Sequence, residues 1–116
     1  MNNDRVGLAE ELVTADGLFA IDSEQIVVHW SESAQAILGF RAEEVLGRPC
    51  YEVIHGLDSE DYSFCRRNCP IFADARAGRP RPNYDILCVT AEGERKWLNV
   101  SVVLPRPDRP FQLVHM

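Results

Sequence analysis

The fold is decided at residues 16–30, which read DGLFAIDSEQIVVHW. Residues 18–21 are a short apolar run, and residues 25–30 are rich in β-branched and aromatic side chains, a composition typical of strands. Asp22-Ser23-Glu24 lies between the two runs and predicts a turn. The spacing therefore predicts an antiparallel hairpin with strands at 18–21 and 25–30.

Short helices are expected after this hairpin. Ser31 is a natural N-cap, and apolar residues then recur at helical spacing until Gly39. Another short turn of helix is expected at 43–46, and a compact apolar turn at 49–56, followed by a polar loop at 57–69. Pro70 suits the first position of another helix, which ends at Gly78 because glycine commonly follows the last helical turn.

The last third of the chain returns to strands. They are expected at 84–90, 96–104 and 111–116, and Glu92-Gly93 forms the turn between the first two. In the second of these strands the apolar residues of one face are Leu98, Val100, Val102 and Leu104. Two strands, several short helices and then three strands predict an α+β fold, an antiparallel sheet with helices on one face.

Residues 4–14 predict a short amphipathic helix ahead of the hairpin, with Leu8, Leu12 and Val13 on its apolar stripe. A lone helix of three turns is not stable in water, so this stripe must dock on the domain or on a partner subunit. We therefore expect an N-terminal helix within residues 1–15, one domain at 16–116, and a homodimer.

Composition limits the function. The chain has 116 residues, 46% of them hydrophobic, which suits one soluble domain. Its net charge of −6 repels phosphates, so we expect no nucleic-acid or membrane binding by this domain. It lacks a signal peptide pattern and any apolar run of roughly 20 residues, which favours a cytoplasmic location. Because it stops inside a strand-like apolar run, we expect a fragment of a longer protein.

Nearly the whole chain resembles the PAS family. The segments that carry the resemblance, in family order and spacing, are DGLFAID (16–22), IVVHW (26–30), Ala34 with ILGF (37–40), EEVLG (43–47) and GERKWL (93–98). The resemblance implies a five-stranded antiparallel sheet of order 2-1-5-4-3 with short helices on one face, and makes residues 16–116 a PAS sensory domain. Members of the family bind small ligands between sheet and helices or pair through the other face, and usually precede an output domain.

A narrower resemblance concerns GRPCYEVIHG (47–56) together with Cys65, Asn68, Cys69 and Pro70. These residues are similar to those of cysteine-bearing PAS domains in bacterial regulators. The similarity implies an input domain of a transcription regulator with a LuxR-type helix-turn-helix output, which binds a small ligand or senses redox state. A sensor histidine kinase and a ligand-free dimerisation module are the alternatives. Any DNA contact would come through an output domain that this chain lacks.

An apolar pocket is expected between the sheet and the helices, since ligand sites are mostly apolar. The residues expected to line it are Ile37, Leu38, Val53, Ile54, Phe72, Leu98 and Val100. We expect a small apolar ligand there, whose identity the sequence does not give.

Four cysteines in a cytoplasmic domain do not indicate a disulfide framework. Cys50, His55, Cys65 and Cys69 are candidates for a metal or redox site, because zinc takes sulfur and nitrogen ligands and iron–sulfur clusters take thiolates. The alternative is that all the thiols are inert. The face on which Cys88 lies depends on whether the turn at Glu92-Gly93 has two or three residues.

We expect no cofactor, with a metal ion or iron–sulfur cluster left open. Pro49 and Tyr51 replace the Asn and Arg that flank the flavin-linking cysteine in light-oxygen-voltage domains, which argues against flavin. Residues 70–78 contain no histidine where haem-binding PAS domains often carry one. Neither a nucleophile elbow nor a phosphate loop is present, so we expect no catalytic residues and no enzyme activity.

Overall fold

The computed structural model describes residues 16–57, 65–79, 83–103 and 111–115. Its five strands form one antiparallel sheet of order β2-β1-β5-β4-β3, which confirms the expected α+β architecture. The strands are β1 (Leu18–Asp22), β2 (Val27–Trp30), β3 (Tyr84–Val89), β4 (Arg95–Val103) and β5 (Phe111–His115). The helix expected at 4–14 lies outside the described residues, as do Leu104 and Met116.

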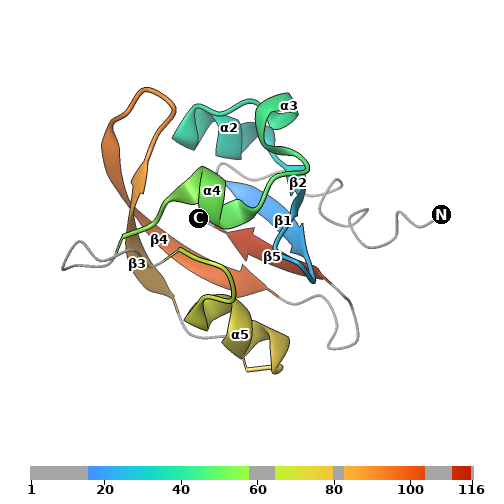
Figure 1. The fold of residues 1–116 in the computed structure, drawn as a ribbon. Coiled ribbons are helices and arrows are strands. Elements are labelled where there is room, and N and C mark those ends of the chain that lie inside the picture. The colour runs from blue at the N-terminus through green and yellow to red at the C-terminus, as the bar shows by residue number, and fades with distance from the viewer. Residues whose placement is uncertain (1–15, 58–64, 80–82, 104–110, 116) are drawn as a thin grey trace.

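Short helices cover one face of the sheet (Figure 1). They are α2 (Glu32–Leu38), α3 (Ala42–Val45), α4 (Cys50–Ile54) and α5 (Pro70–Arg76). In the view of Figure 1, α2 and α3 lie at one end of the sheet, α5 lies at the other, and α4 lies between them. Within the described residues no helix is long and apolar enough to cross a membrane.

The second strand begins later than its composition predicts. The Asp22 carboxylate accepts hydrogen bonds from the backbone N–H groups of Glu24 (2.8 Å) and Ile26 (3.0 Å). These bonds extend the turn to Gln25, whose φ of 65° is left-handed and incompatible with a strand. The prediction of strand from residue 25 was therefore wrong, and β2 starts at Val27.

The turn between β3 and β4 settles the position of Cys88. The N–H of Thr90 donates to the carbonyl of Glu94 at 2.8 Å, so three residues form the loop, and Gly93 takes the left-handed conformation (φ 87°). This register pairs Cys88 with Lys96 and Leu87 with Trp97. Cys88 is fully buried in the core, whereas Trp97 is 55% exposed.

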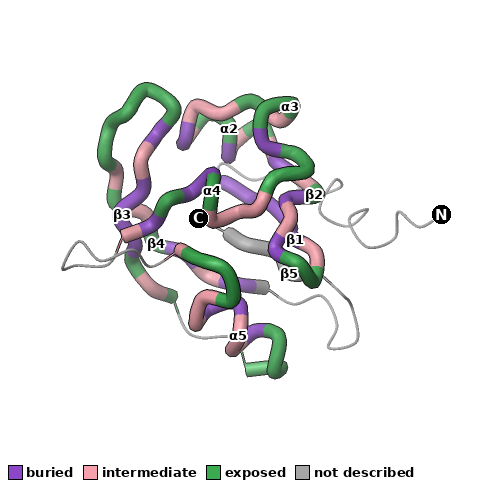
Figure 2. The backbone as a smooth tube through the Cα atoms, viewed as in Figure 1, coloured by how far each residue is buried: buried purple, intermediate pink, exposed green. Residues whose placement is uncertain are grey.

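The core lies between the sheet and the helices. Buried residues concentrate where strands meet helices, and the outer turns are exposed (Figure 2). Phe19 and Trp30 pack with ring centroids 5.4 Å apart, and the Trp30 indole N–H donates to the carbonyl of Phe40 at 2.9 Å. Leu38 and Val53 are buried in the same cluster. This packing fills the space between the sheet and helices α2 and α3, so a cavity has to lie under another part of the helical layer.

Candidate functional site

A cavity of about 60 Å³ lies between the sheet and the part of the helical layer formed by α4 and α5. Strands β1, β3 and β4 supply one wall, and α4, α5 and the turn before α5 supply the other. Among the residues that the structure describes, only Gln25 and Tyr84 bring polar side-chain groups to it besides the sulfur atoms of the cysteines. The lining residues are Phe19, Ile21, Gln25, Cys50, Ile54, Cys65, Cys69, Ile71, Phe72, Tyr84, Ile86, Val100 and Val102.

The cavity lies nearer to α5 than the sequence predicts. Ile54, Phe72 and Val100 line it. The other expected residues, Ile37, Leu38, Val53 and Leu98, pack in or against the main core cluster instead. Side chains of the core cluster fill the space beneath α2, and the gap lies beneath α4 and α5.

Three cysteines from separate segments meet at this cavity. Cys50 is the first residue of α4, Cys65 lies just before a turn, and Cys69 is the N-cap of α5, where its sulfur accepts a hydrogen bond from the N–H of Phe72 at 3.5 Å. His55 does not join them, because it is exposed at the C-cap of α4 in a left-handed conformation (φ 52°). Three of the four residues predicted for a metal or redox site are therefore neighbours.

Burial holds Cys50 and Cys65 of this cluster, and Cys88 nearby, in their neutral thiol form, because it raises their pKa values. Burial raises the pKa of Cys50 to about 12, with a further contribution from its proximity to Cys65 and Cys69. Burial also raises the pKa of Cys65 to about 11 and that of Cys88 to about 12. Because the thiolate is the nucleophile and the metal ligand, these three groups are weakly reactive at neutral pH. Within the described residues no three His, Cys, Asp or Glu side chains are arranged to hold a metal ion.

Tyr84 belongs to the same cluster. Burial raises the pKa of its phenol, and proximity to Cys65, Cys69, Cys50 and Cys88 raises it further. All four cysteines of the chain therefore interact with one phenol on β3. The sequence places Tyr84 in a strand but carries no signal of this contact.

Gln25 joins the two cysteine segments and was missed by the sequence analysis. Its backbone carbonyl accepts from the N–H of Cys50 at 2.8 Å. Its side-chain amide donates to the carbonyl of Arg66 at 3.2 Å and accepts from the N–H of Asn68 at 2.6 Å. The residue is only 3% exposed. A glutamine after a polar turn gives no hint of burial, because the partners of its side chain lie more than 40 residues away along the chain.

Comparison with solved structures identifies the fold. A domain of the sensory box sensor histidine kinase/response regulator from Geobacter sulfurreducens is similar at 18% identity and a TM-score of 0.70, covering 93% of this chain and 88% of that one. The LOV domain of a blue-light activated histidine kinase from Erythrobacter litoralis is similar at 15% identity and a TM-score of 0.68, and the match covers 89% of this chain and 94% of that one. The light-state dimer of the fungal blue-light photoreceptor Vivid is similar at 17% identity and a TM-score of 0.65, and the match covers 90% of this chain and 78% of that one.

The family itself is established by the sequence. No curated protein matched the chain. The PAS fold family matches residues 4–106, which is most of the chain and includes both cysteine segments. Together with the strand order and the helical layer on one face, this match shows that the chain belongs to the PAS family, whose domains are sensory modules.

Proposed function

We propose that this PAS domain is a signal-input module of a bacterial regulator. It detects a small apolar molecule in the cavity beside Cys50, Cys65 and Cys69, which we call the thiol-lined cavity. The observation that carries the proposal is the cavity itself, whose walls are almost entirely hydrocarbon and sulfur. Protein interiors are close-packed with few voids larger than a water molecule. An apolar void at the contact between sheet and helices therefore favours a binding site over a defect of packing.

The volume of the cavity limits the ligand. An engineered apolar cavity of about 150 Å³ binds benzene, and the cavity here measures about 60 Å³. It has room for a few carbon atoms, as in a short alcohol or a dissolved gas. A larger ligand requires the side chains around it to move.

The sheet offers a route from the cavity to the end of the chain. Residues of β1 and β4 line the cavity, and β5 is hydrogen-bonded between these two strands. A ligand that pushes apart the side chains of β1 and β4 around the cavity also shifts β5, which is hydrogen-bonded to both strands. Such a displacement of packed elements is a common form of switching in proteins.

The output that receives this signal is part of the proposal. The cysteine-bearing segments favour a transcription regulator with a LuxR-type helix-turn-helix domain. The similarity to domains of histidine kinases supports a sensor kinase as the alternative.

Redox sensing is a second candidate function, favoured by the meeting of Cys50, Cys65 and Cys69 at one cavity. In this reaction a disulfide oxidant such as oxidised glutathione takes two electrons from two thiols, which form one protein disulfide while the oxidant becomes two thiols. The test is mass spectrometry of the domain after treatment with oxidised glutathione. A separate measurement of zinc and iron in anaerobically prepared protein tests for a bound metal. A disulfide between two of these cysteines supports the switch, and free thiols under all oxidising conditions contradict it.

The ligand proposal is tested by NMR titration of the reduced domain with 1-propanol. We expect saturable shifts of backbone amides beside the cavity on α5, β3 and β4. Val100→Leu, which adds one methylene to the cavity wall, should weaken binding, whereas the same change at the exposed Val28 should not. If no cavity amide shifts, the domain has a filled core and functions as a dimerisation module.

A further inference from the structure

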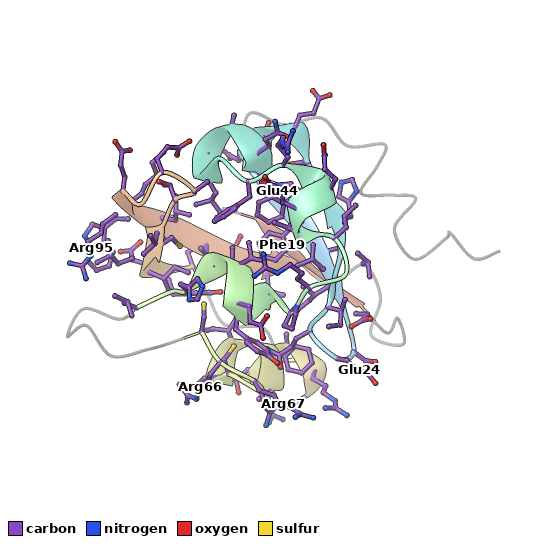
Figure 3. The ribbon with its side chains drawn as sticks, turned by 45° about the horizontal axis from the view of Figure 1, so that its top comes forward. Phe19, Glu24, Glu44, Arg66, Arg67 and Arg95 are labelled. Carbon is purple, nitrogen blue, oxygen red and sulfur yellow. The ribbon has the colours of Figure 1, made fainter. Side chains whose placement is uncertain are left out.

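A second hollow, polar and open to solvent, lies at the surface beside α5. Its volume of about 680 Å³ falls within the range of roughly 300–1,000 Å³ that is common for small-molecule sites. The β1–β2 turn, α4, the turn before α5 and α5 itself surround it. Its charged lining residues are Glu24, Arg67 and Arg76, and we call it the charged groove. Figure 3 shows Glu24 and Arg67 on separate segments of the chain.

The three charged side chains of the groove form no ion pair with one another or with any other described residue. Both salt bridges within the described ranges belong to Arg41. Glu24, Arg67 and Arg76 are all exposed. The groove therefore presents two positive charges and one negative charge to a molecule that enters it, in a chain whose net charge is −6.

Hydrogen bonds fix two walls of the groove before any ligand arrives. The Asp22 carboxylate accepts from the N–H of Glu24 at 2.8 Å, which holds the turn that carries this residue. The side-chain oxygen of the buried Gln25 accepts from the N–H of Asn68 at 2.6 Å, which holds the turn that carries Arg67. A ligand therefore meets backbone that is already ordered, which lowers the entropic cost of binding.

The charges of the groove select the chemistry of the ligand. The planar fork of donors in arginine matches the two oxygens of a carboxylate, so Arg67 and Arg76 suit a molecule with two carboxylates. The carboxylate of Glu24 repels a ligand that carries negative charge alone and attracts an ammonium group. A molecule with two carboxylates and one ammonium group complements all three side chains.

We propose that the charged groove binds a free acidic amino acid, glutamate or aspartate. The carboxylates of the ligand bind to Arg67 and Arg76, and its ammonium group binds to Glu24. Near neutral pH such a ligand carries one net negative charge, opposite to the one net positive charge of these three side chains. The ligand stays within the groove, so this inference does not depend on what the thiol-lined cavity binds.

The test is NMR titration with L-glutamate and with two analogues that each lack one of its charges. Glutarate lacks the ammonium group, and L-norvaline lacks the second carboxylate. We expect L-glutamate to cause saturable shifts of the backbone amides of Glu24, Arg67 and Asn68. It should bind about fivefold more tightly than either analogue, a ratio that corresponds to about 1 kcal/mol, the upper value for an exposed ion pair.

Substitutions in the groove test each contact. Glu24→Gln should remove the preference for L-glutamate over glutarate, because only the ammonium group loses its partner. The double variant Arg67→Gln, Arg76→Gln should lose L-glutamate binding. Arg95→Gln is the matched control, because it removes the same charge at a position apart from the groove (Figure 3) and should leave the affinity unchanged. Thermal unfolding of each variant verifies that it is folded.

Three results would overturn the inference: no saturable shift with L-glutamate, equal affinity for L-glutamate and both analogues, or a Glu24→Gln variant that keeps the preference over glutarate. The amide shifts that 1-propanol causes on β3 and β4 test the proposed function separately, so failure of one proposal is distinguishable from failure of the other.

Discussion

At the scale of single residues, Gln25 determines how the thiol cluster is assembled. One buried side chain holds the turn between Cys65 and Cys69, and the backbone of the same residue holds the start of α4. A buried polar group whose partner is removed loses its hydrogen bond without regaining water, at a cost of about 1–3 kcal/mol. Gln25 therefore affects stability and thiol exposure together.

Gln25→Ala should lower the free energy of unfolding by about 1–3 kcal/mol, because the N–H of Asn68 loses its acceptor. It should also expose the thiols of Cys65 and Cys69 to reagents. Urea unfolding measures the first effect, and the rate of reaction with Ellman's reagent measures the second. Gln35→Ala, at an exposed position on α2, is the control and should change neither. A variant as stable and as unreactive as the parent would contradict this role.

The buried thiols predict a loss of stability at alkaline pH. Burial raises the pKa values of Cys50 and Cys65 from 9.0 to about 12 and about 11, so the folded state keeps protons that the unfolded state releases. The contribution of these groups is complete below pH 9 and is lost as the pH rises from 9 towards 12. Urea unfolding in reductant between pH 7 and pH 10.5 should show this fall. The fall should be smaller in Cys50→Ala, and an equal fall would show that other groups cause it.

At the scale of elements, the helices are too short to be stable alone, at four to seven residues each. They depend on end contacts and on packing against the sheet. Ser31 illustrates this, since its hydroxyl oxygen accepts from the N–H of Ala34 in α2 and from the N–H of Leu18 in β1, both at 3.0 Å. One side chain thus caps a helix and fixes it to the first strand.

Ser31→Ala should destabilise the domain by about 1–2 kcal/mol, at the upper end for an N-cap because two N–H groups lose their acceptor. Ser31→Thr keeps the oxygen and should recover most of the loss. Thermal unfolding followed by circular dichroism provides the comparison. If threonine is as damaging as alanine, the hydroxyl oxygen is not the cause.

At the scale of the whole molecule, we predict a homodimer that depends on the N-terminal apolar stripe. The prediction comes from Leu8, Leu12 and Val13, and the outer face of the sheet adds an exposed Trp97. The light-state dimer of Vivid is one assembly formed by a similar fold. Leu8→Glu with Leu12→Glu should convert the dimer to a monomer in light scattering, with Glu10→Gln, Glu11→Gln as control. A monomeric parent chain at micromolar concentrations would contradict the prediction.

The sequence by itself determined the class of fold, the order of the sheet through its family resemblance, and most element ends to within one or two residues. These features follow from local signals: the period of apolar residues in β4, the caps at Ser31 and Gly39, and Pro70 at the start of α5. It failed at Gln25, where the side chain of Asp22 bonds the backbone and extends the turn. That signal is also local and was not used in the prediction; the other segments were predicted correctly because the interactions that fix their ends lie close in the chain.

Only the tertiary structure decided where the cavity lies and what surrounds it. The sequence selected the apolar faces but not where a gap would remain between them. Leu38 and Val53 pack away from the cavity, whereas Phe72 and Val100, members of the same core cluster, also line it. It named Cys50, Cys65 and Cys69 as candidates but gave no means to find Gln25 or Tyr84 beside them. These groups meet through contacts between residues far apart in the chain, and close packing of side chains, which no local pattern encodes, determines such contacts.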